Sequence, residues 1–196
     1  MLSFYMGIFL ATFIVAIFTT RFFKLIFWYA LNSFVLGIVA ILMGITENDQ
    51  ALIVSGAITI VLKAFVIPYT LKNISKRFDI KRDIEGTVKV HYNIMLIPTI
   101  IVFTFFLSEP FAHMIGQHAN YVSVAISALF LSFVLMIEHS SIAPKIIGFL
   151  MLENSLFLLG ATATNGMPML IEIGVFVDLM MAIVIVNILL QKESVK

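Results

Sequence analysis

Long apolar stretches with few charges dominate this sequence, and they restrict the chain to folds that suit a lipid bilayer. Seven such stretches occur, at 3–19, 25–45, 51–71, 92–108, 121–137, 144–161 and 168–190. A helix that crosses the hydrocarbon core of a membrane needs about 20 apolar residues. The stretches are continuously apolar, whereas a strand of a membrane β-barrel alternates in polarity over about ten residues. We therefore predict an all-α polytopic membrane protein with seven transmembrane helices in one membrane domain, 1–196.

The composition excludes most other classes of protein. Hydrophobic residues make up 61% of the chain and charged residues 12%, whereas a soluble domain is about half apolar and a quarter charged. The net charge of +1 provides no basic surface for a nucleic acid. The chain has no cysteine, which excludes disulfides, iron–sulfur clusters held by thiolates and cysteine nucleophiles. We expect any redox chemistry that this chain serves to take place in a partner.

The basic residues predict how the helices are oriented. Eleven of the twelve Lys and Arg residues follow the first, third, fifth and seventh stretches: Arg21, Lys24, Lys72, Lys76, Arg77, Lys81, Arg82, Lys89, Lys145, Lys192 and Lys196. Because basic loops stay in the cytoplasm, this alternation predicts an N-terminus outside the cell and a C-terminus in the cytoplasm. It assigns four spans to 1–108 and three to 121–190, with a basic cytoplasmic loop at 72–91 that is either a solvated connector or a docking surface for a peripheral subunit.

Four ionisable side chains lie inside the predicted spans, where a charge is costly unless it is paired, neutralised or faces a protein-lined cavity. Counted from the nearest cytoplasmic basic residue, Lys63 lies about 13 Å along its helix, Glu153 about 12 Å and Asp178 about 21 Å. Glu172 lies about 30 Å from Lys192, near the outer boundary. Three of the four groups are therefore expected at comparable depth on different helices.

Ionisable groups at comparable depth on different helices are what a proton path needs. Burial favours the neutral form of a carboxyl group and a nearby ammonium group favours the charged form, so an acid beside a lysine can switch between them. We interpret Glu153, Asp178, Lys63 and Glu172 as members of a proton relay. The alternatives are a fixed salt bridge between Lys63 and an acid, a lysine stem that bends toward the interface, and a Glu172 that reaches the outer headgroups.

Other polar residues suit simpler roles. Glu138 and His139, at the cytoplasmic end of the fifth stretch, are either boundary residues or the point where protons enter from the cytoplasm. No mid-membrane histidine pair and no nucleotide, metal or hydrolytic motif occurs, so we expect no cofactor, metal site or catalytic centre in this chain. Pro68 and Pro98 lie within spans, where proline usually kinks a helix. The remaining small polar residues are typical of hydrogen bonds between helices: Asn32, Ser33, Asn93, Ser132, Asn154 and Asn187.

The stretch 144–161 contains a segment with a known counterpart. It resembles the helix that carries the key glutamate in the K-type subunit of respiratory complex I and in the related small subunit of multisubunit cation/proton antiporters. That family shows Gly-Leu-Glu with an asparagine four residues after the glutamate. When Gly148 and Asn154 are matched to this pattern, Leu150 occupies the family's glutamate position and Glu153 follows three residues later.

The whole chain resembles more closely the E subunit of hydrogenase-4-type, formate-hydrogenlyase-like complexes. That subunit carries Gly-Phe-x-x-Leu-Glu-Asn, as at 148–154 here, and a basic third loop. It also has an intramembrane lysine followed by Ile-Pro, as at Lys63, Ile67 and Pro68. A last span with an acid in mid-helix, here Asp178, is shared with the K-type subunits.

This resemblance implies a non-catalytic subunit in the membrane arm of a redox-driven complex in a prokaryotic cytoplasmic membrane. Its partners would be large antiporter-like subunits, a membrane anchor subunit and a peripheral nickel–iron hydrogenase arm. The subunit would contribute to translocation of H⁺ or Na⁺, coupled to electron transfer elsewhere. The alternatives are a stand-alone carrier for a small solute or ion and a structural subunit that seals the arm. Seven spans do not divide into the two equal repeats common in carriers, which weighs against a carrier.

Overall fold

A computed structural model describes residues 1–77, 90–115, 119–139 and 141–163 of the chain. The described segments fold into helices, and the α-helical prediction is confirmed for them. In chain order these helices are α1 (Leu2–Ile17), α2 (Phe22–Glu47), α3 (Gln50–Thr59), the π-helix η1 (Ile60–Val66), α4 (Ile67–Arg77), α5 (Val90–Ile115), α6 (Ala119–Glu138) and α7 (Ile142–Ala163).

Several of these helices have the dimensions of membrane spans. Five helical segments are long and apolar enough to cross a membrane: Phe22–Glu47, Gln50–Asn73, His91–Ser108, Asn120–Glu138 and Ile142–Ala163. They match the second to sixth predicted spans. Helix α1 matches the first predicted span and is shorter, with 16 residues. The seventh predicted span, 168–190, lies outside the described residues.

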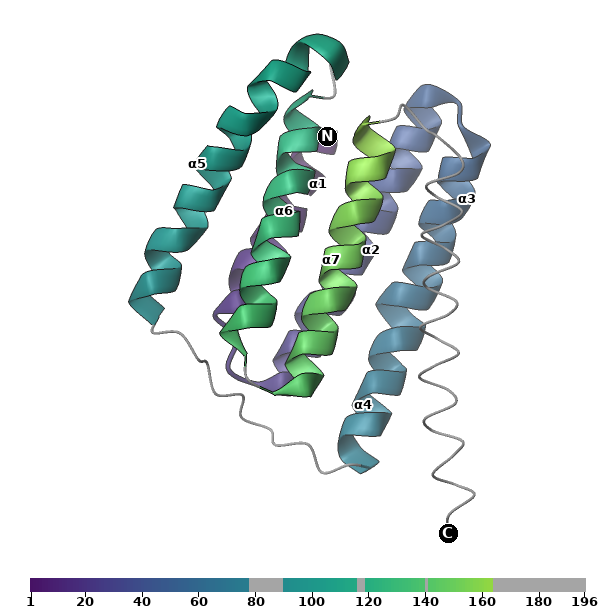
Figure 1. The fold of residues 1–196 in the computed structure, drawn as a ribbon. Coiled ribbons are helices and arrows are strands. Elements are labelled where there is room, and N and C mark those ends of the chain that lie inside the picture. Colours follow the sequence, from purple (N-terminus) through teal and green to yellow (C-terminus); the bar gives the residue numbers. More distant parts are fainter. Residues whose placement is uncertain (78–89, 116–118, 140, 164–196) are drawn as a thin grey trace.

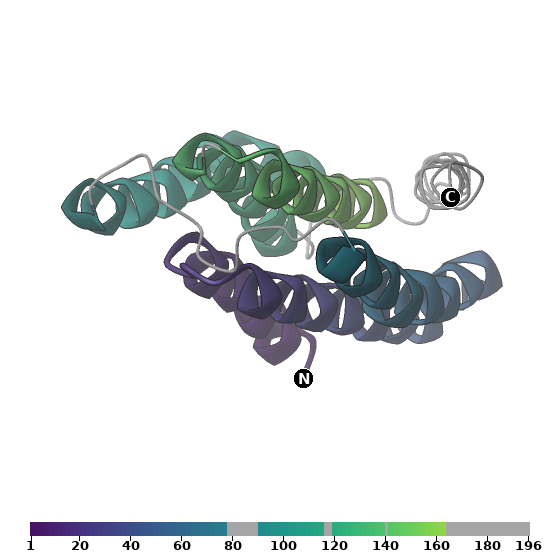
Figure 2. The same cartoon turned by 90° about the horizontal axis from the view of Figure 1, so that it is seen from below.

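The helices are arranged in two layers (Figure 2). Helices α1 and α2 and the rod formed by α3, η1 and α4 make one layer, and α5, α6 and α7 make the other (Figure 1). Across the layers, α1 packs against α6 and α2 packs against α7. The buried core draws on both layers, as with Phe9, Phe13, Leu36, Leu131 and Leu150. A polar side chain between α2, η1 and α7 is therefore enclosed by apolar helices.

The outer faces of the helices are apolar as well. On α5, for example, Met95 is 74% exposed, Val102 70% and Phe106 73%. A soluble protein rarely exposes such a continuous apolar surface, whereas hydrocarbon chains solvate it. The exposed face of α5 therefore suits contact with lipid.

Charges are divided between the two ends of the bundle. The α1–α2 turn, the end of α4, the start of α5 and the α6–α7 turn lie at the lower end in Figure 1. These segments carry the exposed basic residues Arg21, Lys24, Lys72 and Lys145. The α2–α3 turn, with its acidic residues, lies at the opposite end. Among the described residues, the exposed basic side chains thus gather at one end of the bundle.

The α2–α3 turn is short because two residues suit its backbone. Asn48 ends α2 in the left-handed conformation, with a φ of 56°, which asparagine tolerates better than most residues. Asp49 then caps α3, and its carboxylate accepts hydrogen bonds from the backbone N–H of Ala51 at 2.9 Å and of Leu52 at 3.3 Å. Such a cap satisfies backbone donors that the first turn of a helix leaves without partners.

Glycines allow α2 and α3 to approach closely after this turn. A Cβ atom on Gly37 would lie 2.3 Å from Cγ1 of Ile60 and 2.8 Å from the carbonyl oxygen of Gly56. A Cβ on Gly56 would lie 2.8 Å from the carbonyl oxygen of Gly37. Small residues of this kind let backbones of membrane helices come together. This contact fixes the position of the π-helix that follows α3.

Gly37→Ala should therefore destabilise the chain by about 1–3 kcal/mol, since the added methyl group forces the two backbones apart. Gly7→Ala is the matched control, because a Cβ at Gly7 meets nothing within 4 Å. The control should be neutral or slightly stabilising, because alanine is favoured over glycine in a helix by about 1 kcal/mol. Thermal unfolding of both purified variants in detergent, followed by circular dichroism, measures the difference. Equal stability of Gly37→Ala and wild type would contradict the close approach.

Candidate functional site

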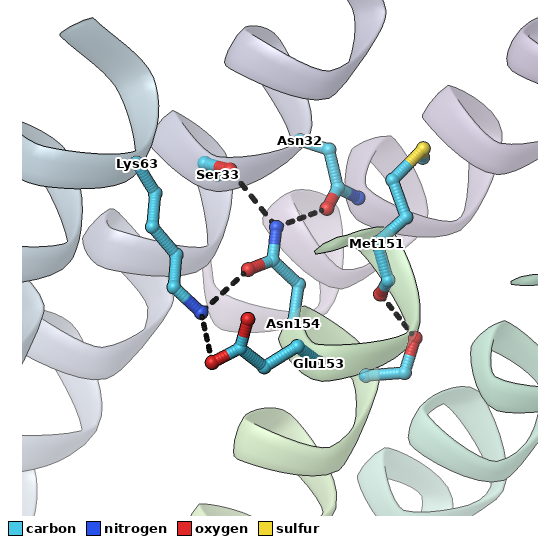
Figure 3. Close-up of polar contacts among 7 residues, drawn as sticks. Asn32, Ser33, Lys63, Met151, Glu153 and Asn154 are labelled. Atoms are coloured by element: carbon cyan, nitrogen blue, oxygen red, sulfur yellow. Dashed lines mark hydrogen bonds and ion pairs between the residues drawn. The ribbon is translucent and has the colours of Figure 1, made fainter. Parts of the chain in front are cut away.

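Lys63 and Glu153 form a buried ion pair between the two layers. Lys63 comes from η1 and Glu153 from α7 (Figure 3). The Nζ of Lys63 lies 3.6 Å from Oε1 of Glu153, and the two side chains are 1% and 9% exposed. The sequence predicts comparable depths for these groups, and the structure places them in contact. Lys63 does not extend along the lipid-facing surface, so the alternative of a stem bent toward the interface is wrong for this structure.

The local backbone around Lys63 is unusual. The seven residues of η1 form a π-helix, and the N–H of Ile67 donates to the carbonyl of Leu62. Pro68 follows directly and has no N–H to give to the carbonyl groups of the preceding turn. Hydrogen bonds in the wider π turn reach back five residues, and this turn precedes the proline that has no N–H to donate. Such π segments occur frequently at functional sites. In α5, by contrast, the helix continues through Pro98 without interruption.

Asn154 ties this pair to α2. Its Oδ1 accepts a hydrogen bond from Nζ of Lys63 at 3.1 Å. Its Nδ2 donates to Oδ1 of Asn32 at 2.8 Å and to Oγ of Ser33 at 2.9 Å (Figure 3). Asn154, Asn32 and Ser33 are fully buried. The amide therefore uses both its donors and its acceptor within the bundle.

The hydrogen bonds continue from Asn32 to α1. Its Nδ2 donates to Oγ1 of Thr12 at 2.8 Å and to the carbonyl oxygen of Phe9 at 3.4 Å. Thr12 in turn donates to the same carbonyl oxygen at 2.6 Å. A chain of polar groups thus runs from Lys63 through Asn154 and Asn32 to α1, and connects four helices.

The hydrogen bonds of this polar network all run in one direction, from donor to acceptor, away from Lys63. A lysine ammonium only donates hydrogen bonds and a backbone carbonyl only accepts them, so Lys63 and the Phe9 carbonyl fix the orientation of both asparagine amides between them. Every donor in the chain points away from Lys63, and the acceptor oxygen of Asn154 faces the ammonium group. The ammonium group of Lys63 thus meets the acceptor end of the hydrogen-bonded chain.

The chemistry of the site follows from the two kinds of side chain that contact Lys63, an amide and a carboxyl group. An amide does not gain or lose a proton near neutral pH, whereas a carboxyl group does. Burial favours the neutral form of Glu153 and the ammonium group of Lys63 favours its charged form. The site therefore brings one carboxyl group and one ammonium group together among amides that only form hydrogen bonds.

A second buried acid lies at the basic end of the bundle. The Nδ2 of Asn93 donates to Oε2 of Glu138 at 2.7 Å, and these side chains are 2% and 5% exposed. Glu138 also lines a groove of about 360 Å³ between α5 and α6. The neighbouring His139 is buried, and its Nδ1 lies 3.0 Å from the carbonyl oxygen of Leu135. Both residues thus lie at a helix end, as the sequence predicts, and both are buried.

The predicted polar residues have different outcomes. Asn32, Ser33, Asn93 and Asn154 make hydrogen bonds between helices, as predicted. Ser132 differs, because its hydroxyl donates to the carbonyl of Leu129 in its own helix. Asp178, Glu172 and Asn187 lie outside the described residues. Within the described ranges, no group of three or more His, Cys, Asp or Glu residues could hold a metal ion.

Sequence reasoning missed two features. The sequence gives no indication that Thr12 receives a hydrogen bond from Asn32. A second polar seam joins α5 to α6, where the hydroxyls of Thr104 and Ser127 and those of Ser108 and Ser123 are hydrogen-bonded. Thr104 and Ser108 are four residues apart on α5, and Ser123 and Ser127 are four apart on α6. Residues four apart share a helix face, so this spacing is the signal that the sequence offers.

Comparison with known proteins gives a distant relative. The chain is 24% identical over 156 residues to an uncharacterized protein of Mycobacterium tuberculosis. The aligned region covers 79% of this chain and 71% of the relative. No protein-family model matches the chain. No solved structure matches it.

Proposed function

We propose that this chain is a membrane-arm subunit of a redox-driven complex of the hydrogenase-4 and complex I type, and that it contributes to the translocation of H⁺ or Na⁺. The observation that supports this proposal is the buried pair of Lys63 and Glu153, 3.6 Å apart between two layers of apolar helices. A charged pair in this position is costly, and a stabilising role alone is served as well by apolar residues.

In this proposal Glu153 is the exchanging group. Its carboxylate takes up a proton and releases it when a neighbouring subunit changes its charge or conformation. Lys63 supplies the positive charge that makes the deprotonated form accessible, and Asn154 holds Lys63 in place. Asp178 and Glu172 would extend the path from the last span. Glu138 and His139 would take up protons at the basic end.

The proposed setting is a prokaryotic cytoplasmic membrane. The chain would cross it seven times, with the N-terminus outside and the basic end of the bundle in the cytoplasm, as positive-inside loops require. Its partners would be large antiporter-like subunits, a membrane anchor subunit and a peripheral nickel–iron hydrogenase arm. The chain itself would carry no catalytic centre or cofactor.

Native purification tests this proposal. The chain, tagged and expressed from its own locus, should be extracted in mild detergent together with stoichiometric antiporter-like subunits and a hydrogenase. Mass spectrometry of the intact assembly identifies the partners and their ratio. A chain that purifies alone and moves a solute or ion in lipid vesicles would instead be a carrier, and the proposal would be wrong.

A further inference from the structure

The turn between α1 and α2 forms a groove at the basic end of the bundle. Its volume is about 700 Å³, and its lining includes Phe18, Arg21, Lys24, Phe27 and Trp28. No acidic residue lines the groove. The groove is separate from the Lys63 site, which lies between the layers. Its surface therefore combines positive charge with aromatic side chains.

The two cations of the groove are available to a ligand. Arg21 precedes the first turn of α2 and Lys24 lies three residues later, so both side chains reach the same side of the helix start. Both are exposed. In the part of the chain that the structure describes, neither side chain takes part in an ion pair. The positive end of the α2 dipole adds to their field.

The apolar part of the groove faces outward. Phe18 is 39% exposed and Phe27 is 60% exposed. The rings of Phe27 and Trp28 meet edge to face, with centroids 5.6 Å apart. Tryptophan is enriched at the boundary between hydrocarbon and water. The groove thus combines exposed cations with exposed aromatic side chains at a helix end.

We propose that this groove binds an anionic phospholipid. Arg21 can hold a phosphate through two parallel N–H donors, and Lys24 adds a second, compact charge. The acyl chains would lie along Phe18 and Phe27. A zwitterionic lipid carries a cationic headgroup that offsets its phosphate, and free phosphate has no chains to bury. Both should therefore bind less well than an anionic lipid, whether or not the chain belongs to a redox complex.

Lipid titration of the purified full chain tests this inference. Native mass spectrometry measures the affinity for phosphatidylglycerol and for phosphatidylcholine with identical acyl chains. Arg21→Gln/Lys24→Gln should weaken phosphatidylglycerol binding about twenty-five-fold, because each basic side chain near an anionic surface contributes about a fivefold gain. The conservative pair Arg21→Lys/Lys24→Arg should retain most of the affinity, since both charges remain.

Lys145→Gln is the matched control. Lys145 is exposed at the same end of the bundle but does not line the groove, so its replacement should leave phosphatidylglycerol binding within about twofold of wild type. Equal affinity of the Arg21/Lys24 variant and wild type would overturn the inference. Equal binding of phosphatidylcholine, or displacement of the lipid by millimolar inorganic phosphate, would overturn it as well.

Discussion

Glu153→Gln should abolish proton translocation driven by electron transfer in the assembled complex. Glutamine keeps the shape of the side chain and its ability to form hydrogen bonds, but it cannot take up or release a proton. Lys63 would then face a neutral amide at the position 3.6 Å away. A positioned proton-transfer group typically contributes a factor of 100 or more, so the pumping rate should fall by at least about a hundredfold. Proton uptake into inverted vesicles, measured per electron transferred, reports this loss.

Glu47→Gln provides the control for loss of a carboxylate elsewhere. Glu47 ends α2 at the opposite end from the basic residues, so its replacement should leave the number of protons per electron unchanged. Blue-native electrophoresis verifies that both variants assemble. Unchanged pumping in an assembled Glu153→Gln complex would show that Glu153 carries no protons, and the pair with Lys63 would then be structural.

The sequence predicts how deep each polar group lies but not which groups meet. Depth follows from counting residues along one helix, and the counts from Lys72 and Lys145 place Lys63 and Glu153 at similar depth. Which helices are neighbours depends on packing across the whole bundle. The contact between η1 and α7 therefore could not be derived from the two positions alone.

Asn154 illustrates the same limit on a finer scale. Its residue type predicts hydrogen bonds between helices, and the structure confirms them. Its role beside Lys63 depends on the π-helix, which moves that side chain relative to a regular helix. The lysine–proline spacing indicates a disturbed helix at Pro68, but it does not indicate the direction in which Lys63 turns.

Lys63→Met should destabilise the folded chain by about 3–5 kcal/mol, because removing one partner of a buried ion pair leaves the charge of the other uncompensated. Methionine fills nearly the same volume without a charge. Asn154 also loses the donor that lies 3.1 Å from its Oδ1, which adds to the cost. Unfolding of the purified variant in detergent, followed by circular dichroism, measures the loss.

The double variant Lys63→Met/Glu153→Met separates the pair from other effects. Replacing both members of a buried ion pair with apolar residues is often neutral or stabilising, so the double variant should recover most of the stability that Lys63→Met loses. A double-mutant cycle completed with Glu153→Met should yield a coupling of at least about 2 kcal/mol, as expected for residues in contact. Additive losses would mean that the ion pair of Figure 3 does not form in the folded protein. The cycle needs only the isolated chain, so it tests this geometry independently of any proton translocation.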